Sequence, residues 1–191
     1  MLKTFSRVSS LLGLVSLAAL AANAQEVVHA LAGTVTSVNP TQQTITIKTD
    51  DGSEGVFKDL MKSNVSYEFD RNIRAGAVPA SSFTKKGAPV IVYYFGDGDV
   101  RTAVALQDLG GAGPLQKISG SVSKFNKHGH LLTIKDATGT SESFHIDTKT
   151  VAETAWGAVE GEKFDPSKGD RVRVTAVLAN GAEDALFIRE N

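Results

Sequence analysis

The chain has 191 residues, no cysteine, and 20 Lys and Arg against 21 Asp and Glu. The lack of cysteine excludes disulfide bonds, so packing alone must hold the fold together. The slightly acidic balance does not favour nucleic acid as a partner, because non-specific binding to nucleic acid draws its affinity from neutralised phosphates.

The amino-terminal segment has the pattern of a cleaved export signal. Lys3 and Arg7 give it a basic start, residues 11–22 form an apolar run, and Ala-Asn-Ala at residues 22–24 is a small-residue cleavage site. The alternative, a membrane anchor, is disfavoured because the run is shorter than the roughly 20 residues that span a bilayer. We therefore predict a signal peptide at residues 1–24, a periplasmic or secreted mature protein, and no membrane span after cleavage.

One stretch of the sequence occurs twice. Residues 33–52 read GTVTSVNPTQQTITIKTDDG and residues 120–139 read GSVSKFNKHGHLLTIKDATG, at an offset of 87 positions without a gap. Seven positions are identical, and others hold conservative pairs such as Ile45 and Leu132. The chain is therefore predicted to be a duplicated β module.

Each copy predicts the same order of strands. Period-two alternation indicates a strand with one buried face, and it places Ile134 and Val174 inward in the second copy. In the first copy, the fourth strand at residues 90–95 is apolar on both faces. Irregular connectors at residues 60–86 and 148–168 separate the third strand from the fourth. After the first strand of each copy, the expected strands are residues 44–49, 56–57, 90–95 and 103–106, and residues 131–135, 143–147, 171–177 and 185–188.

Three strands, a variable connector and two further strands, occurring twice, predict an all-β chain of two tandem small five-stranded barrels. An OB-like barrel has this order, with its variable piece between strands three and four. Other small barrels and sandwiches stay open as alternatives. Between the copies, glycine frees the backbone and proline stops strand pairing. The expected division is β-barrel repeat 1 at residues 25–109, a Gly-rich linker at residues 110–116 and β-barrel repeat 2 at residues 117–191.

The second copy carries a pattern of glycine and apolar residues: G-x-V, T-I-K, a glycine turn, a phenylalanine strand, K-G-D, V-x-V and A-x-x-I. With this pattern the chain resembles a family of exported bacterial domains of unknown function, which often occur in tandem and are assigned small OB-like β-barrels. The first copy departs from it at Ala88 and Pro89, where the aspartate is missing and a proline opens the strand. The resemblance implies the fold and export, and no activity or site. Its residues are Gly120, Val122, Thr133, Ile134, Lys135, Gly139, Phe144, Lys168, Gly169, Asp170, Val172, Val174, Ala185 and Ile188.

Aromatic and basic residues gather in the connector and the fourth strand of repeat 1. OB-type barrels bind oligosaccharides or single strands on such faces by stacking and backbone charge. The alternative is that the aromatic residues belong to the core or pack against the second barrel, since large apolar side chains are mostly buried. Because neighbours on a strand alternate, Tyr93 and Tyr94 cannot both face the core, so at least one lies outside or at the domain interface. The candidate ligand-binding residues are Tyr67, Phe69, Arg71, Arg74, Tyr93 and Tyr94.

Three further features carry weaker signals. His128 and His130, with His145 on a nearby strand, could bind a transition metal through imidazole, but their spacing suits no standard zinc pattern. The triplet Asp97-Gly98-Asp99 is expected to be a hairpin turn and not a calcium loop, because the later acidic ligands are missing. Trp156 in the connector of repeat 2 is either a plug that closes the end of the barrel or an exposed stacking platform, and we expect the plug.

The sequence contains no nucleophile motif, phosphate loop or zinc-protease motif, so neither catalysis nor a cofactor is expected. The leading hypothesis is an exported, non-catalytic binding or envelope-associated module whose ligand is a glycan or another envelope polymer. The alternative is a structural or protein-interaction module that takes no small ligand and whose barrels pair with each other or with a partner protein. A metal-linked hydrolase ranks third.

Overall fold

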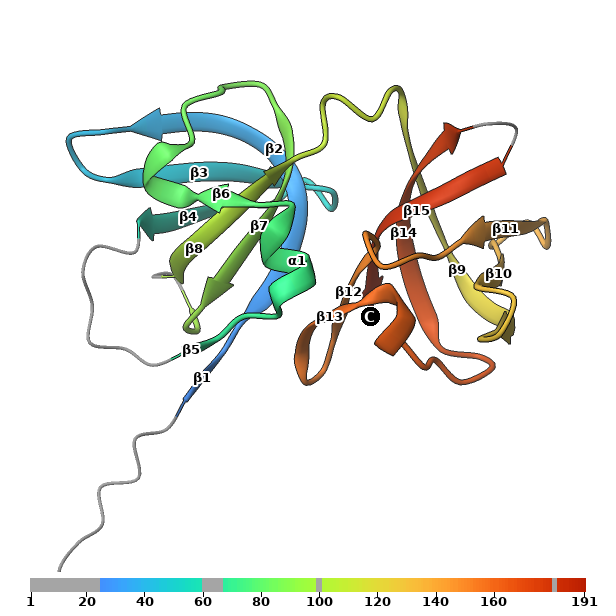
Figure 1. The fold of residues 1–191 in the computed structure, drawn as a ribbon. Helices are drawn as coiled ribbons and strands as arrows, with labels where there is room; N and C mark the ends of the chain where they lie inside the picture. Colours follow the sequence, from blue (N-terminus) through green and yellow to red (C-terminus); the bar gives the residue numbers. More distant parts are fainter. Residues whose placement is uncertain (1–24, 60–66, 99–100, 180–181) are drawn as a thin grey trace, which may run out of the picture.

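The computed structural model describes residues 25–59, 67–98, 101–179 and 182–191. The predicted signal peptide at residues 1–24 and Asp99 of the predicted turn lie outside these ranges. Within the described ranges the chain is all-β, with one large sheet in each repeat and a short two-stranded sheet beside the first (Figure 1). None of the described helices is long and apolar enough to cross a membrane.

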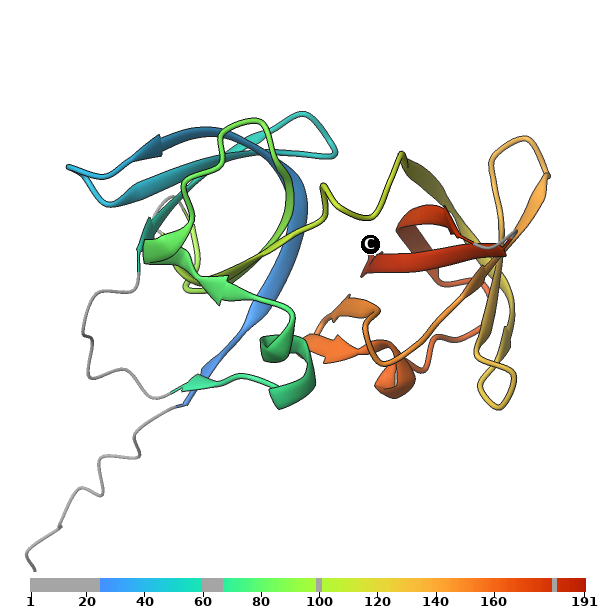
Figure 2. The ribbon, with the colours of Figure 1, turned by 45° about the horizontal axis from the view of Figure 1, so that its top comes forward.

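The sheet of repeat 1 closes into a ring. Its hydrogen-bonded order is β4-β3-β2-β7-β8-β6, and a parallel pairing of β4 with β8, which sets Phe57 beside Arg101, closes it. The other neighbours in the ring are antiparallel, and Figure 2 shows the strands circling a common interior. The strands are β2 (His29–Asn39), β3 (Thr44–Thr49), β4 (Glu54–Asp59), β6 (Val78–Pro79), β7 (Pro89–Phe95) and β8 (Arg101–Asp108).

Repeat 2 has the same ring with a hairpin added to it. The order is β11-β10-β9-β14-β15-β12-β13, and a parallel contact of β11 with β15, His145 beside Asp184, closes the ring. In both repeats the first strand pairs with the second and the fourth, and the fifth pairs with the third and the fourth. The strands are β9 (Leu115–Asn126), β10 (Leu131–Lys135), β11 (Ser141–His145), β12 (Val151–Thr154), β13 (Gly157–Glu160), β14 (Arg171–Ala179) and β15 (Ala182–Glu190).

The two connectors differ from each other and from the irregular segments expected. In repeat 1 the described part of the connector holds β5 (Tyr67–Glu68), the helix α1 (Arg71–Ala75), β6 and the turn η1 (Ala80–Ser82). In repeat 2 the connector folds into the β12–β13 hairpin, followed by η2 (Gly161–Lys163). The sequence did not predict these short strands, because each depends on a distant partner: β6 and β12 pair with β8 and β15.

Each ring encloses its own apolar core. Ile47, Phe57 and Val92 are buried in the first ring, and Ile134 and Val174 are buried in the second. Ile134 and Val174 both have 0% exposure, which confirms the inward positions that period-two alternation predicted. The repeated sequence therefore encodes two equivalent cores.

A close approach of two strands explains the first glycine of the repeated stretch. A Cβ atom on Gly33 would lie 2.5 Å from the carbonyl oxygen of Lys48, and one on Gly120 would lie 2.5 Å from that of Lys135. Only glycine fits such a contact, so the same residue recurs at both positions.

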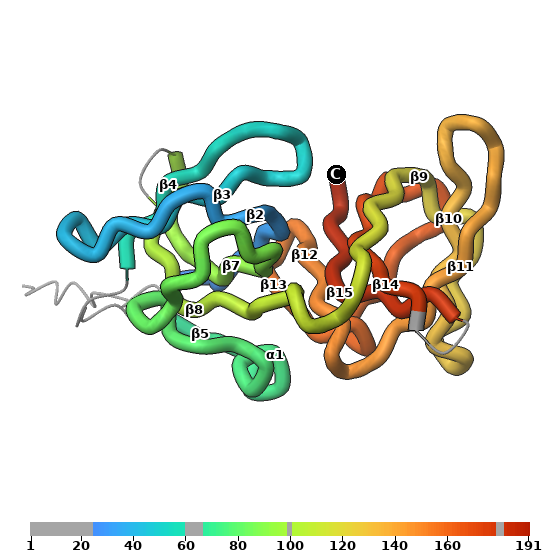
Figure 3. Tube along the Cα trace, turned by 90° about the horizontal axis from the view of Figure 1, so that it is seen from above, coloured from blue at the N-terminus to red at the C-terminus, as the bar shows by residue number. Residues whose placement is uncertain are grey.

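A third apolar cluster lies between the rings and joins the repeats, which sit side by side with the linker crossing between them (Figure 3). Ile91 and Tyr93 of β7 point away from the core of their own ring and into this cluster. This arrangement explains why residues 90–95 are apolar on both faces. The cluster combines Val28, Ala30, Ala32, Ile73, Ile91, Tyr93, Ala105 and Leu109 from repeat 1 with Val151 and Phe187 from repeat 2.

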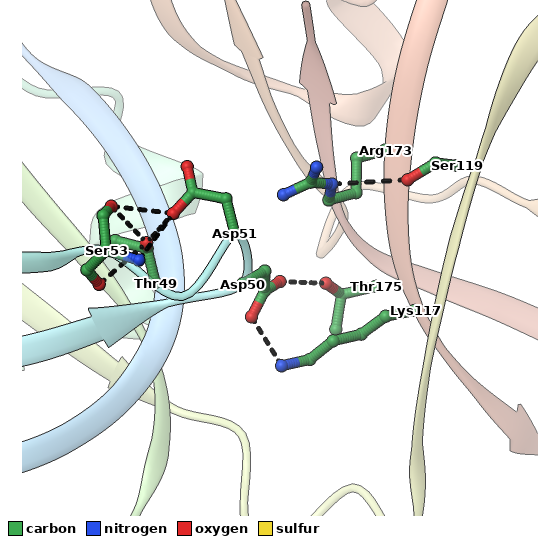
Figure 4. Close-up of polar contacts among 8 residues, drawn as sticks. All are labelled: Thr49, Asp50, Asp51, Ser53, Lys117, Ser119, Arg173 and Thr175. Atoms are coloured by element: carbon green, nitrogen blue, oxygen red, sulfur yellow. Dashed lines mark hydrogen bonds and ion pairs between the residues drawn. The ribbon is translucent and has the colours of Figure 1, made fainter.

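Polar contacts also cross from repeat 1 to repeat 2. The carboxylate of Asp50 accepts hydrogen bonds from Lys117 Nζ at 2.5 Å and from Thr175 Oγ1 at 3.4 Å (Figure 4). Glu153 of β12 accepts the backbone N–H of Ala30 at 2.7 Å and lies 2.6 Å from His29 Nδ1. Burial raises the pKa of Glu153, although these two hydrogen bonds act against the shift.

Candidate ligand groove between the repeats

A groove at the interface has a volume of about 400 Å³ and is lined by residues of both repeats. Repeat 1 contributes its amino-terminal strand β1 (Glu26–Val27) and the segment that begins with β5, which pair in parallel. Repeat 2 contributes the β12–β13 hairpin and the residues after it. The lining residues are Gln25, Glu26, Val27, Val28, Glu68, Asp70, Trp156, Ala158, Val159 and Lys163.

Backbone contacts hold the β12–β13 hairpin against repeat 1. The hairpin forms one wall of the groove, so these contacts also position that wall. The N–H of Ala158 donates to the carbonyl oxygen of Val28 at 2.8 Å. Gly157 has φ +105°, and a Cβ atom there would lie 2.5 Å from Val27 Cγ1, so the contact requires glycine. The hairpin can approach this closely only because the residue after its tip has no side chain.

The tip of the same hairpin presents Trp156 to solvent. Thr154 Oγ1 accepts the N–H of Trp156 at 3.1 Å and donates to the carbonyl oxygen of Gly157 at 3.0 Å, so the turn has a defined shape. The side chain of Trp156 is nevertheless 88% exposed at the rim of the groove. The expectation that Trp156 plugs the end of the barrel is therefore wrong. Phe164 of the same connector is instead buried in the core of the ring, at 1% exposure.

An ion-pair network crosses the groove. Lys163 Nζ of repeat 2 lies 2.6 Å from Asp70 Oδ2 of repeat 1 and 3.0 Å from Glu160 Oε1. Hydrogen bonds to these two carboxylates raise the pKa of Lys163. Burial would raise the pKa of Asp70, but the hydrogen bonds from Lys163 and from the N–H of Asn72 outweigh it and hold that pKa below the usual range.

Two further carboxylates face the groove from repeat 1. Glu26 and Glu68 are exposed and lie on the paired strands β1 and β5. Neither forms an ion pair with any residue in the described ranges. The groove thus combines one exposed indole, an apolar floor that includes Val28 and Ala158, and hydrogen-bond acceptors that protein cations do not occupy.

Part of the predicted ligand-binding set gathers on the other side of β5. Tyr67, Phe69 and Arg74 line a depression of about 170 Å³. Alternation along this segment explains the division, because Tyr67 and Phe69 line the depression while Glu68 and Asp70 line the groove. Arg71 is exposed on α1 and lines neither of them.

The two neighbouring tyrosines of β7 face opposite ways. Tyr93 is 0% exposed in the interface cluster, where its ring lies 4.9 Å from that of Phe69 and its hydroxyl donates to Gln107 Oε1 at 2.7 Å. Tyr93 is thus the tyrosine of the pair that lies at the domain interface, as alternation along the strand predicted for at least one of the two. Because it is fully buried there, neither face of its ring is open to a ligand. Tyr94 is half-buried on the other face, between Phe57 and the guanidinium of Arg101.

The histidines of repeat 2 do not assemble a metal centre. The rings of His130 and His145 lie 6.4 Å apart, and His145 Nδ1 is 3.6 Å from Asp184 Oδ1. His128 is exposed on the hairpin that precedes β10. Among the residues that the structure describes, no group of three or more His, Cys, Asp or Glu side chains is placed to hold a metal ion.

Sequence reasoning singled out Trp156 but missed the rest of the groove. Lys163, Asp70 and Glu68 come together only because repeat 2 packs on repeat 1, and no local pattern predicts that contact. The apolar outer face of residues 90–95 was the one signal that the repeats are joined.

No family model matches the chain, and a search of curated proteins finds no match. The resemblance to exported tandem domains therefore rests on the residues given for it above.

Proposed function

We propose that the chain is an exported, non-catalytic binding module built of two tandem OB-like barrels, and that it takes a glycan or another envelope polymer in the groove beside Trp156. The observation that carries the proposal is the 88% exposed indole at the rim of a groove with free carboxylates.

The OB-like assignment is supported by the order of the strands in each ring. Starting from the first strand, the order is 1-2-3-5-4 and back to 1, with a parallel contact between the third and fifth strands. The variable segment between the third and fourth strands is also where OB-like barrels carry their insertions. In this chain both insertions line the groove, together with β1.

The choice of a sugar-like ligand follows from the chemistry of the groove. A large aromatic side chain that stays exposed beside a groove indicates a binding site, because its exposure does not stabilise the folded chain. The face of an indole stacks on the apolar face of a sugar ring, and carboxylates accept hydrogen bonds from sugar hydroxyls. Glu26 and Glu68 line the groove and would accept such hydrogen bonds.

Export and the lack of catalysis complete the proposal. The signal-like segment would place the mature protein in the periplasm or outside the cell, where envelope polymers are found. Cleavage before Gln25 would put the new terminal ammonium group of Gln25, a further hydrogen-bond donor, at the groove beside Glu26. Binding without catalysis is inferred because the sequence carries no nucleophile motif.

The test is a glycan screen of the mature chain, followed by calorimetry of the best sugar with variants. We expect Trp156→Ala to weaken binding about tenfold or more, which is about 1.4 kcal/mol for a lost stacking contact. Leu178→Ala is the matched control, because Leu178 is also an exposed apolar side chain, at 62%, but lies outside the groove. It should bind as the wild type does.

The outcomes separate the two aromatic surfaces. If binding survives Trp156→Ala and is lost in Tyr67→Ala, the ligand sits in the depression of repeat 1 and the groove is not the site. If no glycan or polymer binds, the structural alternative, a protein-interaction module without a small ligand, takes its place.

A further inference from the structure

A second depression lies on the outer face of repeat 2 and is cationic. It has a volume of about 360 Å³ and lies over β9, β10 and β14. It shares no residue with the groove beside Trp156. Its lining residues are Ser119, Gly120, Ser121, Lys135, Asp136, Ala137, Arg171, Val172, Arg173 and Asn191. We propose that this depression binds a phosphate group carried on a sugar or polyol, an inference that does not depend on the proposed function of the groove.

The positive charge is concentrated on one face of the sheet. Arg171 and Arg173 are two residues apart on β14, so both point away from the core, and Arg189 stands directly opposite Arg173 on β15. Like charges directly opposite each other destabilise a sheet. Such an arrangement requires counter-charges, and the chain supplies them for only part of the face.

The arginines nearest to repeat 1 have their counter-charges. Arg173 Nε donates to Ser119 Oγ at 3.3 Å, and its guanidinium points toward Asp51 of repeat 1 (Figure 4). Arg189 lines a small cavity together with Asp50 and Asp51 of repeat 1. These two cations are therefore part of the contact between the repeats.

Arg171 and Lys135 have no such partner. Both are exposed, and neither forms an ion pair with any residue in the described ranges. Asp136 is the acidic side chain among the lining residues, and its carboxylate bonds to its own hairpin: it accepts the N–H groups of Thr138 and Thr140 at 2.8 Å each and the Thr138 hydroxyl at 2.7 Å. The Asp136 carboxylate therefore makes its hydrogen bonds within that turn, and Arg171 and Lys135 remain available to a ligand.

The donors present suit an oxyanion with several oxygens. A guanidinium offers a planar fork that matches phosphate bidentately, an ammonium adds a point charge, and serine hydroxyls donate further hydrogen bonds. Ser121 stands between Lys135 and Arg171, because it pairs with Lys135 on one side and with Arg171 on the other. A depression of about 360 Å³ also leaves room for the group that carries the phosphate.

The equivalent face of repeat 1 supports the inference by contrast. The cross-strand pair Ser119 and Arg173 corresponds to Ala32 and Ile91, which are buried in the interface. The position of Arg171 corresponds to Pro89. The same strands thus carry an apolar, covered face in repeat 1 and a cationic, open one in repeat 2.

The experiment is a titration of the isotope-labelled mature chain with glucose 1-phosphate, followed by the backbone amide signals. We expect saturable shifts at residues 119–121 and 171–173. Arg171→Gln should weaken binding about tenfold and Lys135→Gln several-fold, since each removes a charge-assisted hydrogen bond. Affinity should also fall as salt is raised, because exposed charges are screened.

Matched variants control for general effects of charge and folding. Lys86→Gln removes an exposed lysine from repeat 1 and should bind as the wild type does. Trp156→Ala should also leave phosphate binding unchanged, so that failure of this site and failure of the groove are told apart. Arg171 and Lys135 are exposed, so their variants should keep the thermal unfolding midpoint of the wild type.

Other ligands decide what the site takes. Tighter binding of glucose 1-phosphate than of inorganic phosphate supports the proposal, whereas equal binding overturns the part that requires a carrier. Equal shifts with glucose itself, or an Arg171→Gln affinity equal to that of Lys86→Gln, would overturn the site. Binding only to vesicles that contain phosphatidylglycerol would replace it with a membrane surface.

Discussion

Repeat 1 and repeat 2 have the same inner face and different outer faces on the fourth strand. Val90 and Val92 of β7 match Val172 and Val174 of β14, and all four are buried in the core of their ring. On the outer face, Ile91 is covered by repeat 2, whereas its counterpart Arg173 borders an open depression. The inner face must fill a ring, and the outer face is free to change, so a duplicated module gains new contacts there.

The connectors, like the outer faces, differ between the repeats while the rings stay the same. In repeat 1 the segment after the third strand forms β5 and α1, and in repeat 2 it forms the β12–β13 hairpin. The rings do not depend on either form, because both close through the pairing of the third and fifth strands. The two different insertions meet across the interface and, together with β1, line the groove.

The largest expected effect comes from exchanging the outer-face residues. Ile91→Arg would bury an unpaired charge in the interface and should lower the free energy of unfolding by about 3–5 kcal/mol. The reciprocal Arg173→Ile removes the hydrogen bond to Ser119 and a cation that faces Asp51, but Arg173 is only partly buried, so it should lower the free energy of unfolding by about 1 kcal/mol or less. Denaturant unfolding measures both. Similar effects for the two variants would mean that the outer faces are equivalent.

A smaller and equal effect is expected on the two inner faces. Ile47 and Ile134 are matched positions of the repeat, and both are 0% exposed. Truncation to alanine should cost about 2–5 kcal/mol at either position, through lost transfer energy and the cavity left behind. If one variant costs less than about 1 kcal/mol in denaturant unfolding, the cores are not equivalent.

The smallest effect concerns the ion pair across the groove. Asp70→Asn should lower stability at pH 7 by about 1 kcal/mol or less, because Lys163 is more than half exposed. Asparagine can still cap α1, so the variant removes mainly the charge. Amide exchange of Ala158, whose N–H bonds to Val28 across the interface, should quicken.

The pH dependence of this pair has a definite sign. The pKa of Asp70 lies below its ordinary 3.8, so its ionised form stabilises the fold above that pH, and the contribution is lost as pH falls through the lowered pKa. The difference between wild type and Asp70→Asn should therefore vanish in acid. Asp108→Asn breaks the Lys85 pair inside repeat 1 and is the control: it should leave exchange at Ala158 unchanged.

The sequence predicted the parts of the fold that depend on local alternation. The alternating strands, such as residues 44–49, 131–135 and 171–177, and the inward positions of Ile134 and Val174 follow from period-two patterns, which a strand with one buried face shows. The β12–β13 hairpin and the packing of the repeats were not predicted, because they depend on partners far along the chain. Of the candidate site, Tyr67, Phe69 and Arg74 do lie together. The exposure of Trp156 could not be predicted, since a lone tryptophan gives no sign of which side of a turn it occupies.

The most direct test of the difference between the two outer faces uses the repeats as separate chains. Residues 115–191 carry a complete ring and contribute two buried residues, Val151 and Phe187, to the interface cluster, against eight from repeat 1. This chain should therefore unfold cooperatively and stay monomeric in analytical ultracentrifugation. Residues 25–109 would expose Ile91, Tyr93 and Ala105, and should bind residues 115–191 in a one-to-one complex that Ile91→Arg abolishes. Two folded repeats that show no association when mixed would contradict the view that the outer face of repeat 1 exists to be covered by repeat 2.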